Sequence, residues 1–125
     1  MKQDIANRAD LYIIVRDFYN YLFQSTDISH FFESFKHEDA LQEHLATLVD
    51  FWDNTLFYSG AYKKNAMKPH FIIHEEKGLQ ASDFDEWIFL FKKAVDDNFK
   101  GENSETIKSR ALSIATVMKL KMNLS

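Results

Sequence analysis

Helix-breaking residues are scarce in this chain of 125 residues, and all of them fall between segments of helical periodicity. They are three glycines and one proline: Gly60, Pro69, Gly78 and Gly101. In the segments between them, apolar residues recur at spacings of three and four, which places them on one face of a helix. No segment shows the alternation of apolar and polar residues that a half-buried strand needs. The sequence therefore predicts an all-α fold.

Two long helices are predicted in the first half of the chain. The first extends from Asp10 to Phe23 and the second from about Glu38 to Phe57, with the short aromatic segment 28–35 between them. The expected inward faces consist of Leu11, Ile14, Val15, Phe18 and Leu22 in the first helix, and Leu41, Leu45, Leu48, Trp52 and Leu56 in the second. Each set keeps helical spacing throughout its segment.

Two further helices are predicted after a long connection, residues 58–81. Pro69 can begin one short helix inside this connection, because proline suits the first helical position. Connections of this length are uncommon in compact domains and are usually functional. Ser82 is predicted to cap the third long helix, with Asp85 completing a capping box, and Ser104 is predicted to cap the last one. The last helix is expected to continue to the C-terminus.

The length of the chain fits one domain over residues 1–125 with one sizeable core. That core is unusually rich in rings, since the chain has twelve phenylalanines, five tyrosines and two tryptophans. Such a core can be ordinary packing, and it can also surround a large flat group. Composition alone leaves both readings open.

Charge and cysteine content exclude several classes of function. The net charge is -4, with no basic stripe, which argues against nucleic acid as the main partner. The longest apolar runs are too short for a signal peptide or a membrane span, so no membrane partner is expected. The absence of cysteine excludes disulfides, thiolate nucleophiles, iron–sulfur clusters and covalent haem attachment. A cytoplasmic location is the natural expectation.

Several polar side chains border the predicted inward faces. His44 follows Leu41 by three residues and precedes Leu48 by four, so it lies on or beside the inward face of the second helix. By the same spacing, Tyr19 borders the inward face of the first helix, and Trp87 lies within that of the third. Each of the three, taken singly, is more often a hydrogen-bonded core residue than a functional one.

A fourth candidate, His70, directly follows Pro69 and would lie in the first turn of the short helix. His70 and His74 are four residues apart and could offer two nitrogens to zinc, but no motif supplies a third ligand. The chain has no nucleophile elbow, no phosphate-binding loop and no dinucleotide fingerprint.

Taken together, the order and spacing of these residues resemble the truncated haemoglobins, and most of all their third group. The resemblance extends from about Asp4 to Met122. It rests on FY at 18–19, EHLATLVDFWDNTLF at 43–57, YSGAYKKNAMKPH at 58–70 and FDEWIFLF at 84–91.

The resemblance implies a shortened globin, two helices crossed over two, that holds haem b without a covalent link. By this resemblance His70 is the proximal ligand of the iron. Tyr19, His44 and Trp87 are the polar residues of the distal pocket where a diatomic gas binds. The residues expected to contact the cofactor itself are Phe32, Leu48, Phe51, Trp52, Tyr62, Met67 and His70.

Three functions follow as alternatives. The first is a haem b protein that binds dioxygen, nitric oxide or carbon monoxide through an iron that can be five-coordinate. The second is an enzyme, a nitric-oxide dioxygenase or a peroxidase-like protein, which would need a separate reductase because the chain has no room for a flavin or nicotinamide domain. The third is a haem-free helical interaction module in which the polar residues are core.

Overall fold

The structure is a computed structural model that describes residues 2–26, 28–58 and 78–123. Within these ranges every regular element is helical, as predicted. In chain order they are α1 (Arg8–Gln24), the 3-10 helix η1 (Ser29–Lys36), α2 (Glu38–Phe57), α4 (Ala81–Asn98) and α5 (Glu102–Lys121). The predicted connection 58–81 ends where α4 begins. The short helix expected at Pro69 lies outside the described residues.

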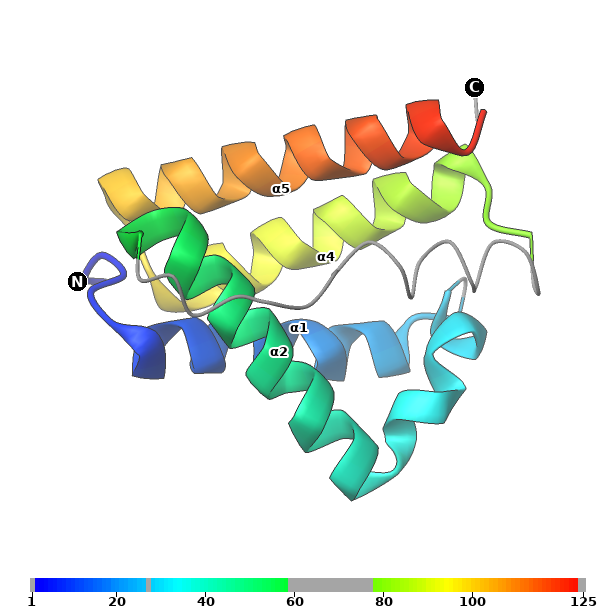
Figure 1. The fold of residues 1–125 in the computed structure, drawn as a ribbon, viewed down its shortest axis with the longest axis horizontal. Coiled ribbons are helices and arrows are strands. Elements are labelled where there is room, and N and C mark those ends of the chain that lie inside the picture. Colours follow the sequence, from blue (N-terminus) through cyan, green and yellow to red (C-terminus); the bar gives the residue numbers. More distant parts are fainter. Residues whose placement is uncertain (1, 27, 59–77, 124–125) are drawn as a thin grey trace.

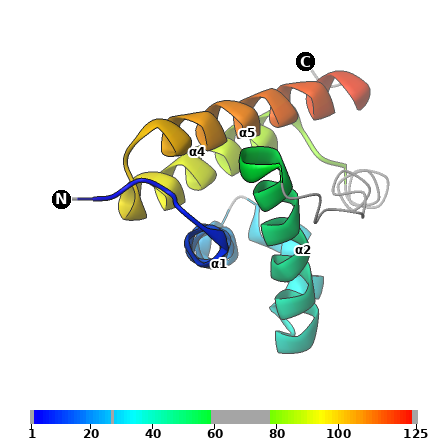
Figure 2. The same cartoon turned by 60° about the vertical axis from the view of Figure 1, so that its left-hand side comes forward.

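The four long helices are arranged as two pairs, one of α1 and α2 and the other of α4 and α5 (Figure 1). α4 and α5 run antiparallel to each other, while α2 crosses α1. α1 packs against both α4 and α2, and the C-terminal part of α2 reaches α5, as the turned view in Figure 2 also shows. This is the expected arrangement of two helices over two. No described helix is long and apolar enough to span a membrane.

The predicted inward face of the first helix is buried along its whole length, since all five of its apolar residues are inaccessible to solvent or nearly so. The predicted face of the second helix behaves differently. Leu45 and Trp52 are buried, but Leu41, Leu48 and Leu56 are only half-buried and pack against the edge of the core. α2 therefore leaves part of its apolar face uncovered among the described residues.

The N-terminus of α4 differs from the prediction. The helix begins at Ala81, so Ser82 lies inside its first turn and is not the cap. Gln80 is the cap, and its backbone N–H donates to Asp83 Oδ2 at 2.8 Å in a capping box. The prediction with Ser82 and Asp85 was wrong because serine is a far more usual capping residue than glutamine.

The N-terminus of α5 also differs from the prediction, because Ser104 is its third residue and not its cap. Asp4, from the segment before α1, performs the capping. Its Oδ1 accepts hydrogen bonds from the backbone N–H and the hydroxyl of Ser104 at 2.9 and 2.8 Å, and its Oδ2 accepts one from the N–H of Asn103 at 2.8 Å. Gly101 permits this approach, since a Cβ there would lie 2.5 Å from the Asp4 side chain.

Asp4→Ala is expected to lower the free energy of unfolding by about 0.5–2 kcal/mol, the usual cost of losing a helix cap. Burial by itself raises the pKa of Asp4, but the hydrogen bonds from Asn103 and Ser104 outweigh it and hold the pKa below its ordinary value. The stabilisation is therefore complete at neutral pH and is lost as the pH falls below about 3.9 and through the folded pKa. Urea unfolding at pH 7 and pH 3 measures both effects.

Asp85→Ala is the matched control, because that carboxylate is exposed and, among the described residues, pairs with Lys119 alone at 3.2 Å. It should change the free energy of unfolding by less than about 1 kcal/mol. Equal effects of the two substitutions, or an Asp4 effect that persists unchanged at pH 3, would contradict the capping role.

Candidate functional site

The crossing of α1 and α2 brings two predicted site residues together. Tyr19 on α1 is 3% exposed, and its hydroxyl oxygen lies 2.5 Å from Nε2 of His44 on α2. The two residues are far apart in sequence, so only the crossing of the helices makes this contact. His44 is half-buried, beside the inward face of α2 as its spacing predicted.

Aromatic rings from η1 fix the orientation of this pair. The ring of Phe35 stacks on the His44 imidazole, with centroids 4.2 Å apart and planes 13° from parallel. Phe32 meets the Tyr19 ring edge-on at 5.9 Å. Phe35 thus covers one face of the imidazole, while Nε2 at its edge meets the Tyr19 hydroxyl. Sequence reasoning missed Phe35, because nothing in an aromatic turn tells which ring will meet His44.

Burial raises the pKa of the Tyr19 hydroxyl above its ordinary value, so the group stays protonated at any physiological pH. A neutral hydroxyl has one proton to donate and lone pairs to accept. If His44 Nε2 carries the ring proton, it donates to Tyr19, and the hydroxyl proton is left for another acceptor. If the proton is on Nδ1, Nε2 accepts the hydroxyl proton instead. The tautomer of His44 therefore decides whether Tyr19 can donate elsewhere.

Tyr19 also forms part of the wall of a cavity of about 130 Å³, called the central cavity here. Four helices supply its described lining: Val15, Phe18, Tyr19, Leu48, Phe51, Trp52, Trp87, Phe91, Ile114 and Met118. Every one of these side chains is aliphatic, aromatic or a thioether. The cavity is therefore an apolar space that borders the Tyr19 side chain.

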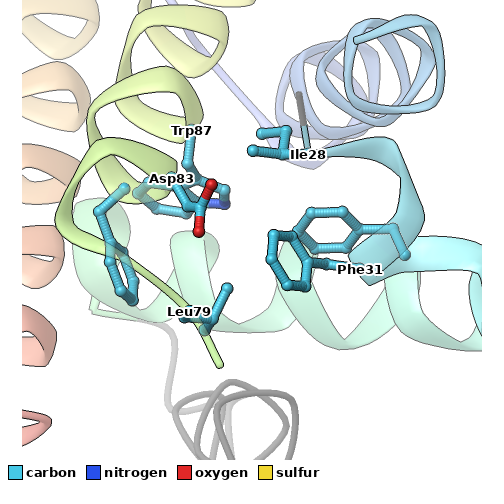
Figure 3. A pocket seen from close by; sticks show the side chains of 7 residues that line it. Ile28, Phe31, Leu79, Asp83 and Trp87 are labelled. Atoms are coloured by element: carbon cyan, nitrogen blue, oxygen red, sulfur yellow. The ribbon is translucent and has the colours of Figure 1, made fainter. Parts of the chain in front are cut away.

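A second, smaller cavity of about 20 Å³, called the side cavity here, lies between η1 and the start of α4. In Figure 3, Ile28 and Phe31 approach it from one side and Leu79, Asp83 and Trp87 from the other. Phe32 and Phe84 complete the described lining. Trp87 is the one described residue that lines both cavities.

The predicted cofactor contacts fall into two sets. Leu48, Phe51 and Trp52 line the central cavity, and Phe32 lines the side cavity. The remaining predicted contacts lie outside the described residues: Tyr62, Met67 and His70. Sequence reasoning missed the cavity-lining residues Phe18, Phe91, Ile114 and Met118. Their spacing predicts a buried face, and no sequence signal separates a residue facing a cavity from one facing another side chain.

The described residues contain no group of three or more His, Asp or Glu side chains that could hold a metal ion. The predicted iron ligand His70 and the pair His70 and His74 lie outside these residues, so their assignment stays a prediction. Within the described part of the chain, the site is a polar pair beside an apolar cavity.

Comparison with known proteins identifies the fold. No protein-family model matches the chain, and no curated protein matches it. Among solved structures, the crystal structure of the group III truncated haemoglobin from Campylobacter jejuni matches with a TM-score of 0.86 and 22% sequence identity. The match covers 98% of this chain and 95% of that one. The resemblance expected from the sequence is thus confirmed for the fold: this chain has the fold of a group III truncated haemoglobin.

Proposed function

We propose that residues 1–125 form one domain that holds haem b and binds a diatomic gas: dioxygen, nitric oxide or carbon monoxide. The observation that carries the proposal is the buried Tyr19, whose hydroxyl pairs with His44 and whose side chain lines an apolar cavity. A fully apolar cavity would suit any small hydrophobic molecule. One permanently protonated hydroxyl beside it favours a small ligand that accepts a hydrogen bond.

The lining of the two cavities fits a porphyrin in its chemistry. A porphyrin is a flat, largely apolar ring, and the described lining consists of flat and branched apolar side chains with Asp83 as its one charged residue. In the proposal, Phe32, Leu48, Phe51 and Trp52 contact one part of the ring. The other part is assigned to Tyr62 and Met67, and the iron to His70.

Haem, when bound, would supply an iron atom that takes the gas as a ligand. The role of this chain is then to hold the gas by hydrogen bonds. Tyr19 donates its hydroxyl proton, and His44 leaves that proton available when Nε2 donates to Tyr19. The Trp87 indole N–H is proposed as a second donor. Because the surrounding side chains exclude water, each such bond is stronger than it would be in solvent.

Phe35 enters the proposal through its stacking on His44. By fixing the plane of the imidazole, it keeps Nε2 directed at the Tyr19 hydroxyl and not at solvent. Tight capture of the gas by several donors favours a role in binding or conversion over simple oxygen storage. Chemical conversion of the bound gas would require electrons from a separate protein. We therefore also propose a reductase as a partner, and the cytoplasm as the location.

The test is a titration of the purified full-length chain with haem. We expect a Soret band that saturates at one haem per chain, and a shifted band when the ferrous protein takes up carbon monoxide. Circular dichroism recorded in parallel reports whether the chain is helical. A helical protein without a Soret band would overturn the proposal and favour the haem-free interaction module.

A further inference from the structure

We propose that two copies of this chain associate as a symmetric dimer through one surface of α4 and α5, with Phe89 at the twofold axis. This surface, called the outer face here, is the side of the two helices turned away from α1 and α2, and its central residues are Phe89, Leu112 and Leu120. The partner is a second copy of the same chain, selected by the apolar and charged side chains of the outer face. The proposed dimer is independent of the proposed function.

The outer face exposes large apolar side chains. Phe89 on α4 is 62% exposed, and Leu112 and Leu120 on α5 are 45% and 70% exposed. α5 lies at the edge of the molecule in Figures 1 and 2, with no described helix beyond it. Single apolar side chains on a surface are ordinary, but contiguous ones mark contacts with other proteins. The arrangement of these residues therefore decides whether they form such a contact.

Phe89 and Leu112 occupy facing rows of the two antiparallel helices. Two ion pairs fix the register of α4 against α5: Asp85 with Lys119 at 3.2 Å, and Asp96 with Lys108 at 2.6 Å. Phe89 follows Asp85 by four residues, and Leu112 follows Lys108 by four. Residues four apart lie above one another on a helix, so each apolar side chain lies on the same row as its bridging neighbour. The apolar part of the outer face thus lies between the two ion pairs.

Phe89 points away from the candidate functional site. Trp87 and Phe91, two residues to either side of it, line the central cavity. Residues two apart on an α-helix point about 200° apart, so Phe89 lies on the opposite side of α4 from the cavity. A second molecule can therefore contact Phe89 without touching the cavity, and a substitution of this exposed ring should leave the core intact.

The charges around Phe89 complement those of a second copy. Asp85 and Glu86 precede Phe89 by four and three residues, and Lys92 and Lys93 follow it by three and four. If α4 packs antiparallel on α4 of a second copy about Phe89, Glu86 comes opposite Lys93 and Asp85 comes opposite Lys92. The twofold axis repeats each of these contacts. A parallel arrangement would bring like charges together, so the charges select an antiparallel second copy.

The same axis also suits α5. The two ion pairs place Ala115 level with Phe89, so the axis brings Leu120 level with Ser109 of the second copy to within about 1.5 Å, the rise of one residue. A large side chain thus meets a small one, which lets the two α5 helices approach each other.

The size of the outer face predicts a dimer that dissociates on dilution. α4 has 18 residues and α5 has 20, so they extend for about 27 and 30 Å. At the usual interaxial distance of about 10 Å, two such helices present a flat area of about 600 Å². A standard interface buries about 800 Å² on each partner. We therefore expect a reversible dimer whose population depends on concentration.

Sedimentation equilibrium of the purified full-length chain measures the association. We expect the average mass to rise with concentration from that of one chain towards that of two. Phe89→Asp should weaken the association by about 100-fold or more, because it removes a buried ring from each copy and places two like charges at the axis. Circular dichroism should show that the variant is helical.

Tyr58→Asp is the matched control, since it replaces another exposed aromatic ring by the same charge. Tyr58 is 86% exposed at the end of α2, outside the outer face, and aspartate tolerates its left-handed backbone conformation. This variant should associate like the wild-type chain.

Two charge reversals test the antiparallel register. Glu86→Lys and Lys93→Glu should each weaken self-association by about ten-fold, because an attractive pair becomes repulsive at two symmetric places. A mixture of the two variants should associate like the wild-type chain, since the two positive charges of one copy then face the two negative charges of the other. Lys93→Glu also removes the ion pair with Asp97 in its own chain, a loss that mixing cannot repair. Lys36→Glu, at an exposed lysine of η1, changes the net charge equally and should leave the association unchanged.

A wild-type chain that stays monomeric at every concentration would overturn the inference and leave the outer face to a different protein. Equal effects of Phe89→Asp and Tyr58→Asp would exclude this face as the interface. A mixture that associates as weakly as its two components would exclude the antiparallel register.

A haem titration of Phe89→Asp separates the dimer from the proposed function. We expect loss of the dimer with an unchanged Soret band. If the chain dimerises as described but binds no haem, the function is wrong and the interface stands. If it binds haem and stays monomeric, the function stands and the interface is wrong.

Discussion

Haem binding is expected to be lost when His70 is replaced by alanine. In the proposed function His70 supplies the imidazole nitrogen that ligates the iron. Loss of a residue that merely orients a metal ligand typically costs ten- to a hundred-fold in affinity, so loss of the ligand itself should cost more than about 100-fold. The measurement is the Soret titration of His70→Ala beside the wild-type chain. The variant should show no stoichiometric band, while its circular dichroism stays helical.

His74→Ala is the matched control, since it removes the neighbouring histidine four residues later. It should bind haem like the wild-type chain. Imidazole added to His70→Ala should restore part of the band, because the free ring can occupy the position that the side chain left. A normal band in His70→Ala, or its loss in His74→Ala, would show that the iron ligand has been assigned to the wrong residue.

Dioxygen is expected to dissociate about 10- to 150-fold faster from Tyr19→Phe than from the wild-type haem-loaded chain. The substitution removes the hydroxyl and little else, since the ring keeps its packing against Phe18 and Phe32. A hydrogen bond to a charged acceptor contributes about 1.5–3 kcal/mol, which converts into this range of rates. Stopped-flow displacement of dioxygen measures the rate. Carbon monoxide gains far less negative charge, so its dissociation should change little.

Tyr12→Phe is the control for Tyr19→Phe, because Tyr12 lies on the same helix and its hydroxyl donates to Gln42 at the surface. Its dissociation rate should equal that of the wild-type protein. Since the Tyr19 hydroxyl and His44 Nε2 lie 2.5 Å apart, the effects of Tyr19→Phe and His44→Leu should not add in the double variant. An unchanged dioxygen rate in Tyr19→Phe would remove Tyr19 from the proposed ligand contacts.

The sequence by itself determined the elements of this fold. Apolar spacing identified all four long helices, and the bounds predicted for the second, Glu38–Phe57, are those of α2. It also placed Tyr19 on the buried side of α1 and His44 beside the inward face of α2. These predictions succeed because burial on a helix repeats with the helical period, a property of a single segment that can be read from the order of its residues.

Helix ends were less predictable. The caps of α4 and α5 were predicted as Ser82 and Ser104, yet Gln80 caps α4, and Asp4 supplies the bonds at the start of α5. Asp4 precedes Ser104 by 100 residues. A search for local capping motifs cannot find such a partner, because the hydrogen bonds form only after α1 and α5 are in place.

Only the tertiary structure decided which inward residues pack together and which face a space. Leu22 and Leu48 both belong to the predicted inward faces of their helices. Leu22 is nevertheless buried in the core, whereas Leu48 lines the central cavity. Phe35 acquired its role in the same way, by stacking on His44. Periodicity defines the direction in which a side chain points relative to its own helix axis. The distance to the next helix depends on how the axes cross, and that is settled by the packing of all the helices at once.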